Sequence, residues 1–300
     1  GVDESFPAGG RNWPMQCARV ELEGLTFVGH NNTGVDTAGG YSRMQGDLPN
    51  FRELKWYPAP GRYANVERDG QRAIVLKPGS KRCKPEMLRV FQCCFTDLYV
   101  GIDIEVCDVT NICHSWFAQM VYGVRNHGPG QATDISGNCF ADLETAMSLA
   151  YISMSTLHHN SFAYVSKCFS LGEVYHSAIS GNVLNNWKAS TGAAACGAFC
   201  HVAGPARNLT MTGNSLFQEH DSRAKTLTVD EEPNGRSFLQ FENCTNLLVT
   251  GNVIDTAIGE SVVRLVNCDR CRVTENIVTH NGIGSPVDCS DDCTDITADC

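Results

Sequence analysis

The sequence feature that most restricts the fold is a short motif that occurs six times. Each copy places an aliphatic residue or methionine three positions before an asparagine and a large apolar residue two positions after it. Successive asparagines are 22, 22, 32, 38 and 24 residues apart. They are Asn138, Asn160, Asn182, Asn214, Asn252 and Asn276. The pattern continues more weakly through Cys93 and Ser115 on one side and through Asp299 on the other.

A period near 22 residues with short apolar alternation is typical of a parallel β-helix, whose coils stack at about 4.8 Å. Asparagine suits a tight bend, because it tolerates the left-handed backbone conformation and its amide can bond the asparagine of the next coil. The alternative, a βαβ chain, needs amphipathic helices of about 10–15 residues, and the sequence shows no convincing one. We therefore predict an all-β, right-handed parallel β-helix: a solenoid of about 22-residue coils with an asparagine ladder and loop insertions.

The repeat resembles the right-handed parallel β-helix (pectate-lyase-like) superfamily, which includes phage tailspikes and alginate epimerases. The resemblance covers roughly residues 70–300, and more loosely begins at Val20. We expect one β-helix domain over residues 1–300, with an irregular N-terminal cap or loop region at 1–70 and regular coils at 71–300. The ends of the sequence suggest a fragment of a longer chain. This scaffold carries many unrelated functions, so the fold alone does not give the activity.

The composition limits the classes of partner and the location expected for this chain. Lys and Arg number 23 against 33 Asp and Glu, a net charge of −10 that argues against a nucleic-acid partner. The sequence has no apolar run long enough to span a membrane. Sixteen cysteines and three glycosylation sequons, at Asn31, Asn208 and Asn243, predict a secreted glycoprotein at an extracellular, cell-surface or virion-surface location.

The cysteines also align in part with the repeat. Cys168 with Cys200, and Cys244 with Cys268, are expected at equivalent positions of neighbouring coils. At that spacing either pair fits a disulfide. Buried free thiols, packed as small apolar groups, fit equally well.

When the coils are aligned on the asparagine, one strand per coil falls into what we call the first sheet. Its apolar residues alternate and must point inward, so the residues between them point outward. These predict a mixed-charge patch at one end and a shallow trough of small residues in the middle. The outward residues are Val75, Lys77, Asp103, Glu105, Arg125, Ser148, Ala150, Ser170, Gly172, Gln240, Glu242 and Arg264.

The charged patch supplies the catalytic candidates. Asp103 and Glu105 lie two apart on one strand, so their Cβ atoms are about 6.5–7 Å apart, near the carboxyl separation of inverting glycosidases. Lys77 or Arg125 would instead serve lyase chemistry, by neutralising a uronate carboxylate or abstracting a proton. A surface ion-pair ladder explains the same four residues equally well. Familiar catalytic motifs of the superfamily are absent, and the segment 126–128 (Asn-His-Gly) matches the polygalacturonase motif only in part.

In the superfamily that the repeat resembles, sugar chains lie along the first sheet, so the resemblance implies a glycan partner here. The predicted substrate-binding residues combine outward polar groups with aromatic rings of the 33–70 loop that could stack on sugars. They are Trp56, Tyr57, Gln240, Glu242 and Arg264.

Two further clusters are weaker candidates for a metal or acid/base site. Asp134 and four histidines could form a metal or acid/base site, or could be scattered solvent-facing residues. The histidines are His114, His158, His159 and His176. Glu219 and Asp221, in a polar insertion, are the candidates for Ca²⁺, although a solvated acidic loop explains them better. The sequence thus predicts no firm metal site or cofactor.

The leading hypothesis is an extracellular carbohydrate-active protein that cleaves a polysaccharide or oligosaccharide on the first sheet. The acidic net charge favours a neutral substrate, and hence a glycoside hydrolase over a lyase. The alternative is a non-catalytic β-helix segment of a large cell-surface or fibre protein, fibrocystin-like or tailspike-like, that serves structure or binds glycans or proteins. The resemblance to tailspikes also implies a homotrimer.

Overall fold

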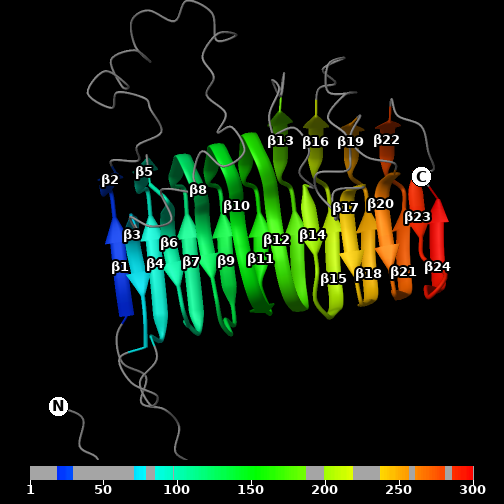
Figure 1. Cartoon of the computed structure of the whole chain (residues 1–300), viewed down its shortest axis with the longest axis horizontal. Helices are drawn as coiled ribbons and strands as arrows, with labels where there is room; N and C mark the ends of the chain where they lie inside the picture. The colour runs from blue at the N-terminus through cyan, green and yellow to red at the C-terminus, as the bar shows by residue number, and fades with distance from the viewer. Residues whose placement is uncertain are drawn as a thin grey trace, which may run out of the picture.

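The computed structural model describes residues 19–29, 71–78, 85–96, 98–186, 199–218, 237–256, 261–280 and 286–299. These ranges contain 24 strands and no helix, joined by hydrogen bonds into one continuous winding sheet. Equivalent strands pair in parallel, coil after coil, along the long axis of the molecule (Figure 1). The predicted all-β, parallel β-helix is therefore confirmed. In these ranges no helix could cross a membrane.

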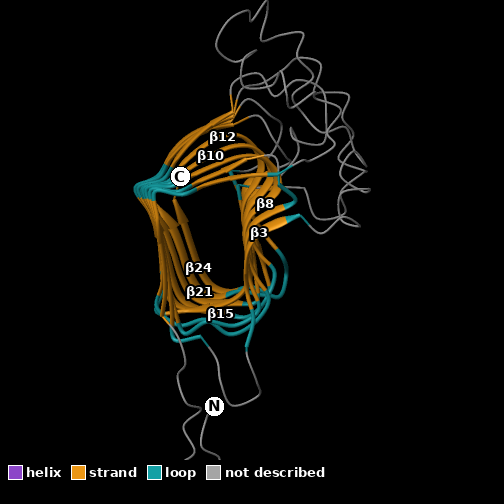
Figure 2. Ribbon diagram, turned by 90° about the vertical axis from the view of Figure 1, so that its left-hand side faces the viewer, coloured by secondary structure: helices purple, strands orange, loops and turns teal. Residues whose placement is uncertain are grey.

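Viewed along the axis, the strands form three faces around a filled interior (Figure 2). The first sheet consists of β3 (Arg72–Leu76), β6 (Val100–Ile104), β14 (Cys200–Val202), β17 (Ser237–Glu242), β20 (Ser261–Val266) and β23 (Val287–Cys289). The second consists of β1 (Arg19–Glu23), β4 (Met87–Phe91), β7 (Val109–Cys113), β9 (Thr133–Ser136), β11 (Thr156–His158), β15 (Ala206–Thr212), β18 (Cys244–Thr250), β21 (Asp269–Thr274) and β24 (Thr294–Asp299).

The third sheet consists of β2 (Thr26–Val28), β5 (Cys94–Thr96), β13 (Val183–Asn186), β16 (Ser215–Gln218), β19 (Val253–Thr256) and β22 (Ile277–His280). Three long strands bend from the third sheet into the first, and two of them continue into the second. They are β8 (Trp116–Asn126), β10 (Cys139–Ser153) and β12 (Ser161–Ser180).

The interior is a stack of apolar side chains in register. Its clearest part is a column of phenylalanines, one per coil, whose ring centroids are 4.7 to 5.3 Å apart. The rings are nearly parallel, so each coil repeats the packing of the last. The column consists of Phe27, Phe95, Phe117, Phe140 and Phe162.

The asparagine ladder runs along the corner between the second and third sheets. Asn138 Nδ2 donates to Asn160 Oδ1 at 3.0 Å, and the four following pairs repeat this bond at 2.8 to 3.1 Å. Each Oδ1 also accepts the backbone N–H of the preceding asparagine. Ser115 continues the ladder, because its Oγ accepts the N–H of Cys93 at 3.1 Å. Every amide of the ladder is thus paired, which fixes the corner of each coil.

Two details of the predicted ladder are wrong. The left-handed residue is the one before each asparagine, not the asparagine itself: Gly137 has φ 64° and His159 has φ 53°. The asparagine instead joins the coils through its side chain: Asn160 Nδ2 donates to the next coil, and Asn160 Oδ1 accepts two bonds from the preceding one. Asp299 does not occupy an asparagine position either, because it pairs with Thr274, two residues before Asn276.

The first coil begins earlier than the regular repeat. β1 and β2 pair with β4 and β5, so the segment from Val20 forms an early coil as the sequence suggested. The rest of residues 1–70 lies outside the described ranges, as do the predicted insertion at 219–235 and residues 190–198 of the one at 190–200.

Candidate functional site

The outward positions of the first sheet align as the sequence indicated. Strand pairing connects Val75, Asp103, Arg125, Ser148, Ser170, His201, Gln240, Arg264 and Asp288 in one row across nine coils. Polar groups gather at both ends of this row. We call the first group the Asp103 cluster (Arg72, Asp103, Arg125, His127) and the second the Gln240 cluster (His201, Gln240, Glu242).

Asp103 is enclosed by two arginines and a histidine from the preceding and following coils. Arg125 Nε donates to Oδ1 at 2.9 Å and Arg125 Nη2 to Oδ2 at 3.1 Å. Arg72 Nη1 lies 2.7 Å from Oδ2, and His127 Nε2 lies 2.7 Å from Oδ1. The Arg125 guanidinium also lies over the rings of Tyr99 and Tyr122. Each carboxylate oxygen therefore has two partners, and the side chain is only 2% exposed.

This environment holds Asp103 ionised. Burial by itself would raise the pKa of the Asp103 carboxyl, but hydrogen bonds from Arg125 and His127 and the charges of Arg125 and Arg72 outweigh it and lower the pKa. A general acid needs a raised pKa and an oxygen facing the substrate. Asp103 has neither, and its geometry suits it to hold the surrounding cations in place.

Lys77 and Glu105 lie beside this cluster on the same face. Lys77 Nζ is 3.0 Å from Glu105 Oε1, and the two side chains are 57% and 42% exposed. The four predicted catalytic residues, Lys77, Asp103, Glu105 and Arg125, are thus close together, in two ion pairs. Nothing in the geometry tests their catalytic role, which stays a prediction.

Between the two clusters, the outward positions in line with Asp103 and Glu105 carry only small side chains. Ser148, Ala150, Ser170 and Gly172 lie on β10 and β12, between the strand of Arg125 and the strand of His201. Three strand spacings separate those two strands, about 14 Å. Gly172 is required there, because a Cβ atom would lie 2.3 Å from the Ala150 carbonyl oxygen. This is the trough that the sequence predicted.

The Gln240 cluster is bonded less completely. Gln240 Nε2 donates to Glu242 Oε1 at 2.8 Å, and His201 Nε2 lies 3.0 Å from the same oxygen. Gln240 is 5% exposed, yet its Oε1 has no hydrogen-bond partner. Since buried polar atoms in native proteins nearly always have partners, this oxygen needs a donor that the described residues do not supply.

The remaining predicted binding residues divide into two groups. Arg264 follows Gln240 in the row, and its Nε lies 3.8 Å from Asp288 Oδ2, so it lies beside the Gln240 cluster in a loose ion pair. Trp56 and Tyr57 lie outside the described residues.

Three residues of the site were missed from the sequence. His127 follows Arg125 by two positions and therefore occupies the same row as Glu105, a signal present in the partial 126–128 motif. His201 follows Cys200, whose pairing with Phe169 sets its outward direction. The sequence did not indicate Arg72, because it is the first residue of β3 and precedes the alternation of apolar and outward residues.

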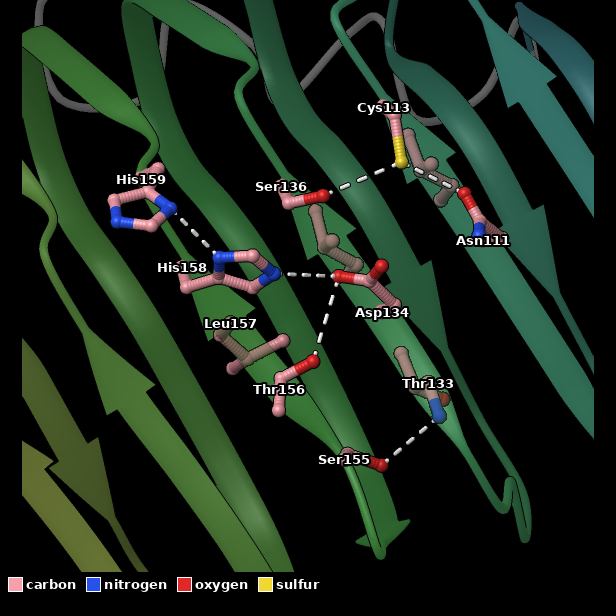
Figure 3. A network of polar contacts seen from close by, with 12 residues as sticks. Asn111, Cys113, Thr133, Asp134, Ser136, Ser155, Thr156, Leu157, His158 and His159 are labelled. Carbon is pink, nitrogen blue, oxygen red and sulfur yellow. Dashed lines mark hydrogen bonds and ion pairs between the residues drawn. The ribbon is translucent and has the colours of Figure 1, made fainter.

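A second polar network lies on the second sheet (Figure 3). His158 Nε2 is 3.1 Å from Asp134 Oδ1, and His158 Nδ1 is 2.9 Å from His159 Nδ1. Of the other predicted members, His114 packs beside Gly137, and His176 bonds Asn208 on another corner. Of the four histidines, His158 alone contacts Asp134, and His159 contacts His158.

No metal site is formed by the residues that the structure describes: no group of three or more His, Cys, Asp or Glu side chains could hold an ion. The Ca²⁺ candidates Glu219 and Asp221 lie outside those residues.

The cysteines in the described ranges other than Cys94 are free thiols. The predicted equivalence of Cys168 and Cys200 is wrong, because Cys200 pairs with Phe169 and the two cysteines are offset by one residue. Cys244 and Cys268 do occupy equivalent positions, since the residues that follow them, Thr245 and Asp269, pair.

Comparison with solved structures finds this fold in DFA-IIIase from Arthrobacter chlorophenolicus A6. The enzyme without its lid has a TM-score of 0.58 at 13% identity, over 92% of this chain and 78% of that chain. A cysteine-to-alanine mutant in complex with DFA-III gives 0.56 at 13% identity, over 93% and 80%.

The complex of the same enzyme with GF2 gives a TM-score of 0.51 at 13% identity, over 76% of this chain and 65% of that chain, which is less than two thirds of its length. No protein-family model and no curated protein sequence matches the chain. At this identity, the similarity shows that the chain shares the parallel β-helix fold of DFA-IIIase.

Proposed function

We propose that this chain is a carbohydrate-active enzyme, a glycoside hydrolase that binds its substrate along the outward face of the first sheet. The observation that carries this function is the unpartnered, buried Gln240 Oε1 at the end of the trough. A sugar offers many hydroxyl donors, and such an acceptor is satisfied by one of them. DFA-IIIase, a carbohydrate-active enzyme of the same fold, was crystallised with GF2 and with DFA-III.

The acid/base chemistry is assigned to Glu242. Glu242 Oε1 takes the bonds from Gln240 and His201, and we assign the reaction to Oε2. The two catalytic groups of a glycosidase act on opposite faces of the bond, about 5–9.5 Å apart, so His201, which lies 3.0 Å from Glu242, positions this carboxylate and does not act across the bond from it. Glu242 exchanges a proton with the leaving oxygen or with the attacking water.

The trough is the path of the sugar chain. Its side chains at Ser148, Ala150, Ser170 and Gly172 are small and uncharged, so a neutral sugar ring can approach the sheet without displacing a charge. These four positions offer no cation to a polyuronate. This supports hydrolysis of a neutral glycan over elimination from a uronate.

The extracellular location predicted from cysteines and sequons belongs to the same proposal. Asn208 and Asn243 are both exposed, as glycosylation requires.

The test is a panel of neutral and acidic oligosaccharides and polysaccharides, with reducing ends and unsaturated-product absorbance followed together. We expect new reducing ends without absorbance. Glu242→Gln should lower the rate about 10²–10⁴-fold, the usual contribution of a general acid or base. Glu105→Gln is the matched control, because Glu105 is another outward carboxylate of the same row and should keep near full activity.

The variants also separate the competing sites. Loss of activity in Glu105→Gln but not in Glu242→Gln would overturn the assignment and favour the catalytic residues predicted from the sequence. An unsaturated product would replace hydrolase with lyase.

A second function is favoured by the state of Asp103. Because both its oxygens are fully bonded, the carboxylate that best fitted a catalytic acid is structural, as in a non-catalytic β-helix segment that binds glycans. Glycan binding that Gln240→Leu abolishes, with no product from any substrate, would establish this function in place of the first.

A further inference from the structure

Three cysteines stand in line at one end of the second sheet. Thr245 pairs with Asp269, and Asp269 pairs with Thr294, so the residues before them occupy equivalent positions in three successive coils. These are Cys244, Cys268 and Cys293, which we call the thiol column. The Cys268 N–H donates to Cys293 Sγ at 3.4 Å, so the column is continuous.

The column goes from the surface into the core. Cys293 is half-buried, whereas Cys244 and Cys268 are each 1% exposed. Hydrogen bonding with the side chains of Cys244 and Cys271 lowers the pKa of the Cys268 thiol. The thiols of Cys244 and Cys268 are thus buried at equivalent positions of adjacent coils, and each donates to a backbone carbonyl, that of Glu242 and that of Phe241.

We propose that Cys244 and Cys268 form a disulfide that joins the two coils when the chain folds in an oxidising medium. Equivalent positions on adjacent parallel strands lie about 4.8 Å apart, within the 4.4–6.8 Å range of Cα separations in disulfides. The other aligned pair does not meet this condition, since Cys168 is offset by one residue from Cys200.

A small disulfide such as oxidised glutathione completes the redox balance. In the open coils the Cys268 thiol loses its proton and attacks one glutathione sulfur, which releases the first glutathione as a thiolate. Cys244 then loses its proton and attacks Cys268 Sγ, which releases the second. The two protein thiols lose two electrons and two protons, and one oxidised glutathione becomes two reduced molecules. Because both sulfurs are buried in the folded chain, the reaction takes place while these coils are open.

The bond would brace the strand that carries the Gln240 cluster. Cys244 follows Glu242 by two residues, and its thiol donates to the Glu242 carbonyl at 3.5 Å. Cross-linking it to Cys268 closes a loop between two coils and removes conformational freedom from the unfolded chain, which raises Tm by several degrees.

Tryptic mapping tests the pairing directly, because arginines separate the cysteines. Cleavage after Arg236, Arg264, Arg270 and Arg272 puts Cys244 in peptide 237–264, Cys268 in 265–270, Cys271 in 271–272 and Cys293 in 273–300. The unglycosylated chain is refolded with oxidised and reduced glutathione, its free thiols are alkylated, and the digest is analysed by mass spectrometry. We expect peptides 237–264 and 265–270 to be joined, two hydrogens lighter than their sum.

Two controls make the result specific. Cys271→Ala should keep the joined peptides, and Cys268→Ala should lose them together with the rise in Tm on oxidation. If Cys268→Ala does not fold, Cys244→Ala replaces it as the control. The wild-type digest tests the pairing without either variant. Alkylation of both Cys244 and Cys268 in the folded, oxidised chain would overturn the proposal, as would linkage of peptide 265–270 to 271–272 or 273–300. None of these results depends on activity toward a glycan.

Discussion

The Asp103 and Gln240 clusters each contain a carboxylate–histidine pair, but they differ in how many of their hydrogen-bonding atoms have partners. Each joins a carboxylate to a histidine of a neighbouring coil: Asp103 with His127, and Glu242 with His201. Asp103 has both oxygens filled by cations, whereas the Gln240 cluster leaves one buried acceptor without a donor. A saturated polar group stabilises the fold, and an unsaturated one has capacity left for a ligand. The two ends of the trough therefore have different roles.

The largest expected effect is on stability at the Asp103 end. Asp103→Asn removes the negative charge from between Arg72 and Arg125, which leaves two cations close together without compensation. We expect unfolding to become easier by about 3 kcal/mol, the cost of breaking a buried ion pair from one side. Urea unfolding measures it. An unchanged urea midpoint would show that the ion pairs of Asp103 contribute little to stability. The Asp103 cluster would then not be the stabilising one of the two.

At the other end, the expected effect is on binding. Gln240→Leu removes one hydrogen bond to Glu242 and also the unpartnered acceptor, so the unfolding free energy should change by less than about 1 kcal/mol. Glycan affinity should fall about 10-fold, which is about 1.4 kcal/mol. Titration calorimetry measures it, with Ser148→Ala as the control inside the trough. Equal affinity for wild type and Gln240→Leu would place the ligand elsewhere.

Lowering the pH should reduce the stability that the Asp103 cluster contributes. The pKa of Asp103 is lowered in the folded state, so its stabilisation is present above the unfolded pKa of about 3.9 and is lost as the pH falls below that value toward the folded pKa. The stability gap between wild type and Asp103→Asn should therefore narrow below about pH 4, by at most about 1.4 kcal/mol per pH unit. Unfolding curves from pH 7 to pH 3 test this, and a gap independent of pH would contradict it.

The smallest effect is expected at the exposed ion pair. Lys77→Met breaks the contact with Glu105, but both side chains are largely solvated, so stability should change by less than about 0.5 kcal/mol. The rate on the best glycan substrate is measured in the same variant. A large loss of rate would return catalysis to the charged end of the trough, where the sequence first placed it.

Much of the fold could be predicted because every coil of a β-helix repeats the same short pattern of apolar and polar residues. The apolar alternation set the inward and outward directions, and the asparagine spacing set the coil boundaries, including the position of Ser115 in the ladder. The errors arose where one residue of offset matters. Cys168 and Cys200 looked equivalent by spacing, yet the pairing of Cys200 with Phe169 shifts them apart.

The sequence by itself determined the solenoid, its period and the row of outward residues, because these follow from side-chain polarity repeated along the chain. Only the tertiary structure decided which of those residues are satisfied. Asp103 is bonded by Arg72 from the preceding coil and by Arg125 and His127 from the following one. Gln240 lies at the same kind of position with an oxygen that no neighbour reaches. Hydrogen-bond saturation depends on side chains that stacking brings together from distant parts of the chain, so no local pattern encodes it.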